Sequence, residues 1–539
     1  MEKKHHFDFD YIIIGSGFGG SVSACRLTEK GYKVAVLEMG KRYTQDDFPE
    51  TTWNLKKYFW IPLVRFFGFF RMTLFRHAWV LSGVGVGGGS LVYANTLLIP
   101  PDGVWKDTHW SHLKDWKNIM KPFYATARKM LGANKNSYLG DCDRVLKEAA
   151  DEQGFGDTFY TTEVGVYFGE PGKTVADPYF GGEGPDRTGC IYCGGCMVGC
   201  RHGAKNTLDK NYLYLAEKGG TQVFAQTKVV DIKPLYEKED GSEGYEVITV
   251  SSTGFFKKPN KFTARGVIFS AGVLGTVKLM LDLKEKGSLP HLSDTVGNLV
   301  RTNSESIIGV RMHNSERDMS KGIAIGSGIH IDDHTHIEAV RYSRGSDSMG
   351  SLTTLLTRGQ PGVSRIFSWL GVIISNPLRF IRMLNPFGFA HSTIILLAMQ
   401  TVDSSIKLKL KRSWWVPFKK HLQTEGPKIP AYIPQANVFA EKLAQKYNGT
   451  PLTGLTEIFF NVPTTAHILG GAVMGKDREE GVIDAQNRVF NYKNMLVCDG
   501  SMIGANLGVN PALTITALTE HAMSQIPNNL NVHSSKREH

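Results

Sequence analysis

Three closely spaced glycines near the start of the chain constrain its fold more than any other feature. Residues 10–14 are predicted to form a buried strand, and Gly15, Gly17 and Gly20 then open a stretch with helical spacing. In such a unit the first glycine permits the tight turn, the second admits a pyrophosphate to the backbone, and the third allows close helix–strand packing. A second apolar run, YKVAVLE, ends at Glu38, at the spacing expected of an acid that binds a ribose hydroxyl. The sequence therefore predicts a Rossmann-like βαβ unit that binds a dinucleotide.

Further strand-like apolar runs are scattered over the middle and the end of the chain, at Gln222–Phe224, Lys228–Ile232, Tyr245–Val250, Val267–Phe269 and 495–501. The α/β dinucleotide-binding domain must therefore be discontinuous, with an α+β substrate-binding domain inserted where the alternation of strands and helices is lost. We expect a first part at 1–305 (with inserted loops at 41–80 and a Cys-rich segment at 186–206), the inserted domain at 306–455, a C-terminal part at 456–530 and a polar tail at 531–539.

A second glycine-rich stretch, at residues 82–95, has apolar flanks. So many glycines do not form a stable helix or a packed strand. The stretch is either a flexible linker or a loop held against a flat cofactor such as a flavin, and the apolar flanks favour the loop. We expect Gly88, Gly89, Tyr93 and Asn95 to contact the cofactor.

The C-terminal region contains the segment TTAHILGGAVMG and a helix predicted at 511–526. Asn510 before Pro511 is typical of a helix start, with Asn as the cap and Pro in the first turn. The positive end of such a helix would stabilise an anionic reduced flavin, although a cap with no further role is equally consistent with the pattern. His467, taken alone, has the surroundings of a core histidine.

The composition narrows the class of protein. A hydrophobic share of 42% and a charged share of 21% are those of a globular protein. The net charge of +11 comes without a long Lys/Arg block or a nucleic-acid-binding motif, so we do not expect a nucleic-acid partner. The absence of a signal-peptide pattern, of disulfide-like cysteine spacing and of any apolar run of roughly 18 residues predicts a cytoplasmic protein.

Taken together, four of these segments resemble the glucose–methanol–choline (GMC) oxidoreductases. They are GSGFGG, GVGVGGGSLV, AHILGGAVMG and DGSMIGANLGVNPALTITALTE, and the likeness extends to VRTNSESIIG and DDHTHIEAVRY. The nearest resemblance is to the cholesterol-oxidase-like branch without a secretion signal. It implies a GMC-type fold, FAD as the cofactor, and oxidation of an alcohol by hydride transfer to flavin N5.

The resemblance also implies roles for particular residues. His467 matches the histidine that takes or orients the hydroxyl proton of the substrate, and Asn510 matches an asparagine near the flavin and the reacting oxygen. Asp499 and Gly500 match a pair that contacts the ribityl side of the flavin, and Val229 matches a backbone contact to adenine. These matches make His467 and Asn510 the predicted catalytic residues.

One expected residue has no clear equivalent. Cholesterol oxidases carry a glutamate that shifts the steroid double bond after oxidation, and Glu338 is the only candidate that we identify. A surface or ion-paired acid is the simpler interpretation of Glu338, so the sequence does not predict isomerisation.

Four cysteines, Cys190, Cys193, Cys196 and Cys200, have the spacing of an iron–sulfur ligand run. Three of them also resemble the cysteine pattern of GMC sugar dehydrogenases that carry a three-iron cluster. A structural zinc site and a reduced, metal-free turn remain alternatives. Cys25, Cys142 and Cys498 are isolated and are predicted to be small core residues.

Two stretches, at 58–76 and 365–384, combine aromatic and aliphatic residues with arginine. This composition suits the lining of a bulky apolar substrate or an interfacial membrane segment. We favour the lining for the first stretch and keep both interpretations for the second.

The predicted function is therefore FAD-dependent oxidation of a sterol-type secondary alcohol, with O2 or an electron-acceptor protein as the partner and with peripheral membrane contact as an open alternative. Two other functions were weighed: an alcohol or sugar dehydrogenase that passes electrons through an iron–sulfur cluster, and a lipid-binding flavoprotein without turnover. The presence of both His467 and Asn510 disfavours the last.

Overall fold

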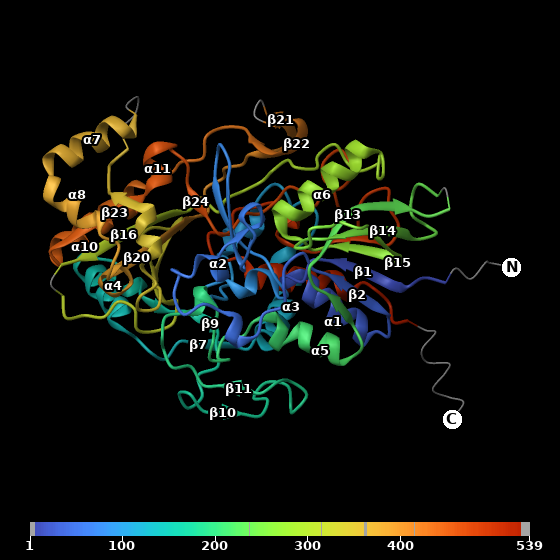
Figure 1. The fold of residues 1–539 in the computed structure, drawn as a ribbon, viewed down its shortest axis with the longest axis horizontal. Coiled ribbons are helices and arrows are strands. Elements are labelled where there is room, and N and C mark those ends of the chain that lie inside the picture. The colour runs from blue at the N-terminus through green and yellow to red at the C-terminus, as the bar shows by residue number, and fades with distance from the viewer. Residues whose placement is uncertain (1–5, 237, 314, 360–363, 414–415, 530–539) are drawn as a thin grey trace.

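The computed structural model describes residues 6–236, 238–313, 315–359, 364–413 and 416–529. Two large sheets lie toward opposite ends of the long axis of the molecule (Figure 1). The predicted tail at 531–539 lies outside the described residues. None of the described helices is both long and apolar enough to span a lipid bilayer. The helices are α1 Phe18–Glu29, α2 Leu55–Tyr58, α3 Trp116–Met130, α4 Asp141–Glu152, α5 Tyr212–Lys218, α6 Gly272–Lys286, α7 Arg365–Ser375, α8 Pro377–Leu384, α9 Phe389–Ser392, α10 Pro434–Lys446, α11 Leu455–Phe459 and α12 Ala512–Ser524.

The first sheet is the dinucleotide-binding sheet, and its strands come from both ends and the middle of the chain. Its order is β12 Gln222–Phe224, β2 Val34–Leu37, β1 Phe9–Ile14, β15 Asn260–Phe269, β14 Tyr245–Ser251 and β13 Thr227–Pro234, with β25 Met495–Val497 also paired to β15. The strands β12, β2, β1, β15 and β25 run parallel, and β13 and β14 are antiparallel to their neighbours. Strands β1 and β2 are buried along nearly their whole length and are continuous apolar runs, which is why the sequence revealed them.

The second sheet is antiparallel. Its order is β19 Thr353–Leu355, β23 Gly449–Gly454, β16 Ser306–Met312, β20 Thr393–Gln400, β18 Thr335–Val340, β17 Ile325–His330 and β8 Tyr160–Thr161. Helices α4 and α10 pack on this sheet around one apolar cluster. The antiparallel sheet and its helices form an α+β unit, and the chain has an α/β fold with a Rossmann-like sheet.

The remaining strands form smaller sheets. One has three strands, β24 Thr464–Thr465, β6 Trp79–Gly83 and β5 Phe70–Leu74, and the others are pairs: β3 Trp60–Ile61 with β4 Phe66–Phe67, β7 Ala133–Lys135 with β9 Glu163–Gly165, β10 Thr174–Val175 with β11 Arg187–Thr188, and β21 Lys407–Ser413 with β22 Val416–Glu425. Elements also cross the expected boundary at 305/306. Strand β8 pairs with the second sheet, and helix α4 packs on it, although both precede residue 306. Conversely, Ile406 just before β21 and Leu408 within β21 pack in the core of the dinucleotide-binding sheet.

The three glycines after β1 have separate roles in the turn into α1. Gly15 has a φ of 100°, and a Cβ there would lie 2.3 Å from the carbonyl oxygen of Ser270. A Cβ on Gly20 would lie 2.0 Å from the carbonyl oxygen of Gly15, so this glycine brings the helix close to the strand. The nearest atom to a Cβ on Gly17 would be 4.0 Å away, which leaves that face open to a ligand. This arrangement matches the roles expected from the glycine spacing.

The tight approach at Gly20 predicts that Gly20→Ala destabilises the fold. Its Cβ overlaps the backbone of Gly15, so the turn must shift, and overpacking of this kind costs about 1–3 kcal/mol. Gly103→Ala is the matched control, because nothing lies within 4 Å of a Cβ at that position. Urea unfolding should show a lower midpoint for Gly20→Ala and a change within about 0.5 kcal/mol for Gly103→Ala. Equal midpoints for the two variants would contradict the close packing.

Candidate active site

The beginning of α1 is an open anion-binding position. Gly17 caps the helix without a side-chain hydrogen bond, and the first turn contains no acidic residue. The free backbone N–H groups and the helix dipole at such an end favour a phosphate. This geometry fits the pyrophosphate of a dinucleotide.

Glu38 follows β2 and is buried beside the same turn. Its carboxylate accepts hydrogen bonds from Ser16 N (3.1 Å), Ser16 Oγ (2.8 Å) and Gly40 N (2.7 Å). Burial raises its pKa, although these hydrogen bonds oppose the rise. Its contact with a ribose stays a prediction. Val229 lies in β13 beside a register shift between Val229 and Asp231, and its adenine contact also stays a prediction.

The second glycine loop packs directly on the first. A Cβ on Gly88 would lie 2.6 Å from the Cα of Gly17, and Gly87 N donates to Ser16 Oγ at 3.1 Å. A Cβ on Gly89 would contact only the ring of Phe18, at 3.7 Å. Residues 82–95 are therefore a loop held against the dinucleotide turn and not a free linker.

Tyr93 and Asn95 end this loop. The ring of Tyr93 meets the ring of Phe18 edge-on at 5.5 Å, and its hydroxyl donates to Asn206 O at 2.9 Å. Lys205 Nζ lies 4.8 Å from the centroid of the same ring, and the cofactor contact of Tyr93 stays a prediction. Asn95 is buried with a left-handed φ of 74°, and its side chain forms a hydrogen bond with the thiol of Cys196. Its contact with a cofactor stays a prediction.

Asp499 and Gly500 lie directly after β25. The Asp499 carboxylate accepts from Ser501 N (2.8 Å), Ser501 Oγ (2.5 Å) and Thr276 Oγ1 (2.5 Å), and burial raises its pKa. The side chain thus fixes the turn at Gly500, and the flavin contact predicted for this pair remains untested.

His467 follows β24, which is held in place by its parallel pairing with β6. Its Nδ1 donates to the carboxylate of Glu305, and that carboxylate also accepts from Ala466 N at 2.9 Å. Glu305 is fully buried, whereas the His467 side chain keeps 13% of its surface exposed. The carboxylate therefore fixes the tautomer, with Nε2 left free to accept a proton.

Asn510 lies opposite His467. Its Nδ2 donates to Glu338 Oε2 at 3.2 Å and lies 3.5 Å from His467 Nε2, while its Oδ1 is buried without a partner. Helix α12 begins one residue after Pro511, and no side chain caps it. Asn510 is therefore directed into the site and is not a helix cap, which decides between the two interpretations of the sequence.

The sequence suggested that Glu338 is a surface or ion-paired acid, and the structure differs from this interpretation. It lies in the middle of β18, fully buried, and not at the surface. Its Oε1 has no hydrogen-bonding partner, and the nearest nitrogen of His336 is 3.8 Å away. Burial raises the pKa of Glu338 to about 7, against the hydrogen bond from Asn510 and the charge of His467. A carboxyl with this pKa can both accept and release a proton near neutral pH.

Two tertiary contacts bring these residues together. Asn303 Oδ1 accepts from Gly508 N at 2.8 Å and its Nδ2 donates to Val509 O at 3.0 Å, so the loop that carries Glu305 is tied to the loop that carries Asn510. Arg301 pairs with Leu469 through two backbone hydrogen bonds of 2.8 and 2.9 Å, two residues beyond His467. Asn303 has a φ of 59°, a strained backbone that this network maintains.

The charge of His467 is set by two carboxylates. Burial disfavours the imidazolium, but the negative charge of Glu305, its hydrogen bond and the charge of Glu338 outweigh burial and raise the pKa of His467. Glu305 was not identified from the sequence as a functional residue. The only available signal was an acidic residue in the NSES segment, directly before an apolar strand.

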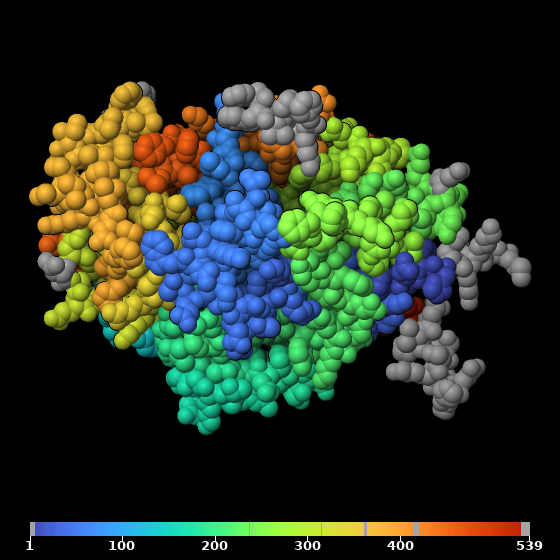
Figure 2. Space-filling model, viewed as in Figure 1, coloured from blue at the N-terminus to red at the C-terminus, as the bar shows by residue number. Residues whose placement is uncertain are grey.

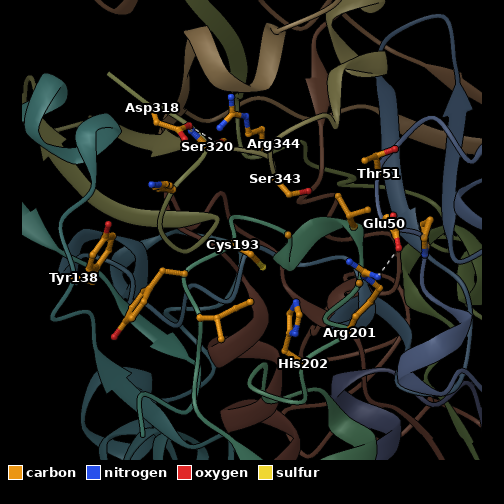
Figure 3. Close-up of a pocket in the computed structure, with 17 residues that line it drawn as sticks. Glu50, Thr51, Tyr138, Cys193, Arg201, His202, Asp318, Ser320, Ser343 and Arg344 are labelled. Atoms are coloured by element: carbon orange, nitrogen blue, oxygen red, sulfur yellow. Dashed lines mark hydrogen bonds and ion pairs between the residues drawn. The ribbon is translucent and has the colours of Figure 1, made fainter. Parts of the chain in front are cut away.

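The four clustered cysteines line one small cavity: Cys190, Cys193, Cys196 and Cys200. In the part of the chain that the structure describes, no three His, Cys, Asp or Glu side chains are grouped so that they could hold a metal ion. Cys190 packs in an apolar cluster, whereas Cys193 lies on the wall of an open pocket of about 580 Å³ (Figure 3). The structure therefore does not support the iron–sulfur or zinc prediction for these thiols.

The open pocket lies outside the catalytic group. Arg201 on its wall points toward Glu50, and the two form an ion pair of 3.2 Å (Figure 3). Neither His467 nor Asn510 lines it. The isolated cysteines Cys25, Cys142 and Cys498 are buried core residues, as predicted.

The aromatic stretch at 58–76 builds a separate cluster. Tyr58, Phe69 and Phe70 are buried together with Phe48, and strands β5 and β6 then lead to β24 and His467. Strand β6 thus separates this stretch from the segment that carries His467, and its contact with a substrate stays a prediction.

The chain is similar to known proteins over nearly its whole length. A family model described as GMC oxidoreductase matches residues 433–519, and one described as an NAD(P)-binding Rossmann-like domain matches residues 13–44. A cholesterol oxidase from Acinetobacter baumannii is 56% identical, over 97% of this chain and 95% of that protein. A cholesterol oxidase from Mycobacterium tuberculosis is 47% identical, over 97% and 91%. Pyridoxine 4-oxidase from Mesorbium loti has the same fold, with a TM-score of 0.61 and 13% identity over 96% of this chain and 98% of that chain.

The chain belongs to the GMC oxidoreductase family. It is an FAD-dependent oxidoreductase that acts on alcohol groups, as predicted from its motifs. The open face at Gly17 and the free backbone N–H groups at the start of α1 fit the pyrophosphate of FAD.

The contact between Glu305 and His467 predicts a shifted pH profile for Glu305→Gln. In the predicted role of His467 as the base, the neutral imidazole accepts the substrate proton, so kcat/KM should rise with pH through the raised pKa of His467. Without the carboxylate that pKa falls, and the rising limb should move to lower pH. The maximum rate should fall about 10- to 100-fold, a part of the roughly 10²- to 10⁴-fold of general-base catalysis.

The matched control for this experiment is Glu457→Gln. Glu457 is also fully buried, but it bonds to Ser306 and Thr453 and does not contact His467. In this variant the rising limb of the kcat/KM profile should lie at the same pH as in the wild type. An unshifted limb in Glu305→Gln, measured on folded, flavin-loaded protein, would refute the role of Glu305.

Proposed function

We propose that this protein oxidises the hydroxyl of a 3β-hydroxysterol to a ketone, with FAD as the cofactor and O2 as the electron acceptor. The observation that supports this most is the buried group formed by His467 Nε2, the Asn510 amide and the Glu338 carboxyl, joined by contacts of 3.2 and 3.5 Å. The two bacterial relatives at 56% and 47% identity are both cholesterol oxidases.

The oxidation needs a base for the hydroxyl proton. His467 accepts that proton at Nε2, and the Glu305 carboxylate stabilises the imidazolium that forms. The unpaired Oδ1 of Asn510 is available to orient the substrate hydroxyl. FAD, when bound, accepts the hydride of the alcohol carbon.

Glu338 supports a second step, the isomerisation that the sequence did not predict. A sterol with a double bond one carbon away from the new ketone carries an acidic proton between the two groups. The Glu338 carboxylate can take this proton and return it at the far end of the double bond, which leaves a conjugated ketone. Its pKa of about 7 suits both transfers.

The two relatives that are cholesterol oxidases favour a sterol over a sugar as the substrate class. A sterol needs one polar end and a long apolar surface. A sugar needs a partner for each buried hydroxyl, because an unpaired one costs about 1–3 kcal/mol. The alternative dehydrogenase, which would pass electrons through a metal cluster, has no ligand group among the described residues.

The decisive experiment is anaerobic mixing of the flavin-loaded protein with cholesterol. We expect the oxidised flavin band to bleach with cholesterol and to persist with glucose. His467→Gln should keep its flavin and bleach about 10²- to 10⁴-fold more slowly, because the base is lost. Bleaching by glucose or choline and not by any sterol would leave the chemistry intact and refute the sterol assignment.

The role of Glu338 predicts a separation of the two steps in Glu338→Gln. The amide is isosteric but accepts no proton, so oxidation should stay within about tenfold of wild type and isomerisation should fall about 10²-fold or more. The product should be the unconjugated ketone. Its mass shows that the alcohol was oxidised, and the missing absorbance of a conjugated ketone shows that the double bond did not shift. In the wild type, isomerisation should increase as pH rises through about 7, because the ionised carboxylate is the base. A conjugated product at the wild-type rate would exclude Glu338.

A further inference from the structure

The open pocket on whose wall Cys193 lies has no catalytic residue in its lining, and we call it the Cys193 pocket. Its walls come from separate parts of the chain: Tyr138 and residues 49–51, 191–202, 318–321 and 343–344. Figure 2 shows the blue, green and yellow parts of the chain, to which these segments belong, meeting on the viewed face. The volume of about 580 Å³ lies in the range of roughly 300–1,000 Å³ in which proteins bind small molecules. The side chains on its walls indicate which class of molecule fits.

Both carboxylates on the walls of this pocket already have partners. Glu50 forms an ion pair of 3.2 Å with Arg201. Asp318 Oδ1 accepts a hydrogen bond from Ser320 N at 3.0 Å and lies 3.0 Å from His391 Nδ1. The negative charges of the pocket are therefore engaged within the protein.

Two cations on the walls have no such partner. Lys321 and Arg344 are exposed, and neither forms an ion pair with any residue that the structure describes. Burial and the charge of Arg201 lower the pKa of His202, so its imidazole is neutral near neutral pH and adds hydrogen-bonding capacity without charge. Excess positive charge in a concave site favours an anion, and a guanidinium matches the geometry of a phosphate. The pocket is therefore suited to a ligand that carries a phosphate.

An aromatic stack forms another part of the wall. Phe168, Tyr192 and Tyr138 stack in this order, with ring centroids 6.1 and 4.3 Å apart, and the two tyrosines line the pocket. Ile191 beside them is 40% exposed. Tyr138 lies on the opposite side of the pocket from Arg201 (Figure 3). A planar ring that enters the pocket can extend this stack, because aromatic rings favour offset-stacked arrangements.

The Cys193 pocket is joined to the second glycine loop by direct contacts. Cys193 lines both this pocket and the small adjacent cavity, which Cys196 also lines. The Cys196 thiol forms a hydrogen bond with Asn95. Lys205 Nζ donates to Cys196 O at 2.8 Å and to Leu91 O at 2.9 Å. A ligand in the pocket therefore touches a segment that is tied to the loop predicted to hold the flavin.

We infer that the Cys193 pocket binds a nucleoside phosphate. The base adds to the ring of Tyr138, and the phosphate lies against Lys321 and Arg344. A simple anion leaves the aromatic wall without a partner, and an uncharged aromatic compound leaves the two cations without one. This site goes beyond the proposed function and does not depend on it, because neither His467 nor Asn510 lines the pocket.

The test uses the flavin-loaded full chain without any alcohol substrate, so that FAD already fills the dinucleotide site. Titration calorimetry should show binding of ADP, whereas adenosine and pyrophosphate should each bind at least about tenfold more weakly, because each occupies only part of the pocket. Lys321→Gln/Arg344→Gln should weaken binding of ADP at least about tenfold and leave the affinity for adenosine unchanged. Tyr138→Ala should weaken binding of ADP and adenosine and leave the affinity for pyrophosphate unchanged.

Lys257→Gln/Lys258→Gln is the matched control. It removes two exposed cations between β14 and β15, outside the pocket, and should leave the affinity for ADP unchanged. Cys193 serves as a reporter in the wild type, because it is the exposed one of the seven cysteines. Saturating ADP should slow its alkylation by iodoacetamide at least about fivefold, measured by the mass of its peptide, because a bound ligand covers the wall of its pocket.

Retention of flavin shows that each variant is folded. Wild type that binds no ADP, equal affinities for ADP in all variants, or pyrophosphate that binds as tightly as ADP would overturn the nucleoside phosphate site. ADP that binds without protecting Cys193 would place the site elsewhere and overturn it as well. Saturating ADP should also shift the absorption spectrum of the flavin through Cys196 and Asn95, and an unchanged spectrum would overturn the link to the flavin loop.

Discussion

Close packing of backbone at the end of β1 is the constraint on which the rest of the structure depends. A Cβ on Gly19 would lie 1.7 Å from the carbonyl oxygen of Cys498, and one on Gly15 would lie 2.3 Å from that of Ser270. Segments from the start, the middle and the end of the chain therefore meet with no side chain between them. Because their strands are parallel and adjacent, the loops that follow them share one edge of the sheet, where a dinucleotide fits.

The predicted catalytic residues also come from segments that are far apart in the chain and meet in the fold. Glu305 immediately precedes β16 of the second sheet, His467 follows β24, and Asn510 precedes α12. Their alignment depends on both units together, so the predicted catalytic residues lie where the two meet. The charges of the two buried carboxylates, Glu305 and Glu338, both raise the pKa of the His467 imidazole. Its protonation state therefore depends on where these carboxylates lie in the fold. The raised pKa values of His467 and Glu338 are consequences of that arrangement.

Much of this organisation could be predicted, because the responsible signals are local. The strands at 222–224 and 245–251 are apolar runs, and the glycine turn has roles that follow from its spacing. His467 and Asn510 were found through motif resemblance. Glu305 and Glu338 were not assigned, because an acidic residue in a strand-like segment has the same local pattern whether it faces water or a histidine. For the cysteine run, spacing alone suggested a metal site, and the described side chains provide no support for it.

The sequence by itself determined the dinucleotide-binding unit, the discontinuity of its domain and the family chemistry, since these depend on short-range patterns of glycine and apolar residues. Only the tertiary structure decided that Asn510 is directed toward His467 and does not cap α12, that Glu338 is a buried acid with a pKa of about 7, and that α7 and α8 keep an uncovered apolar face. The physical reason is that burial, charge and partners are properties of the environment, and residues hundreds of positions away in the chain supply that environment.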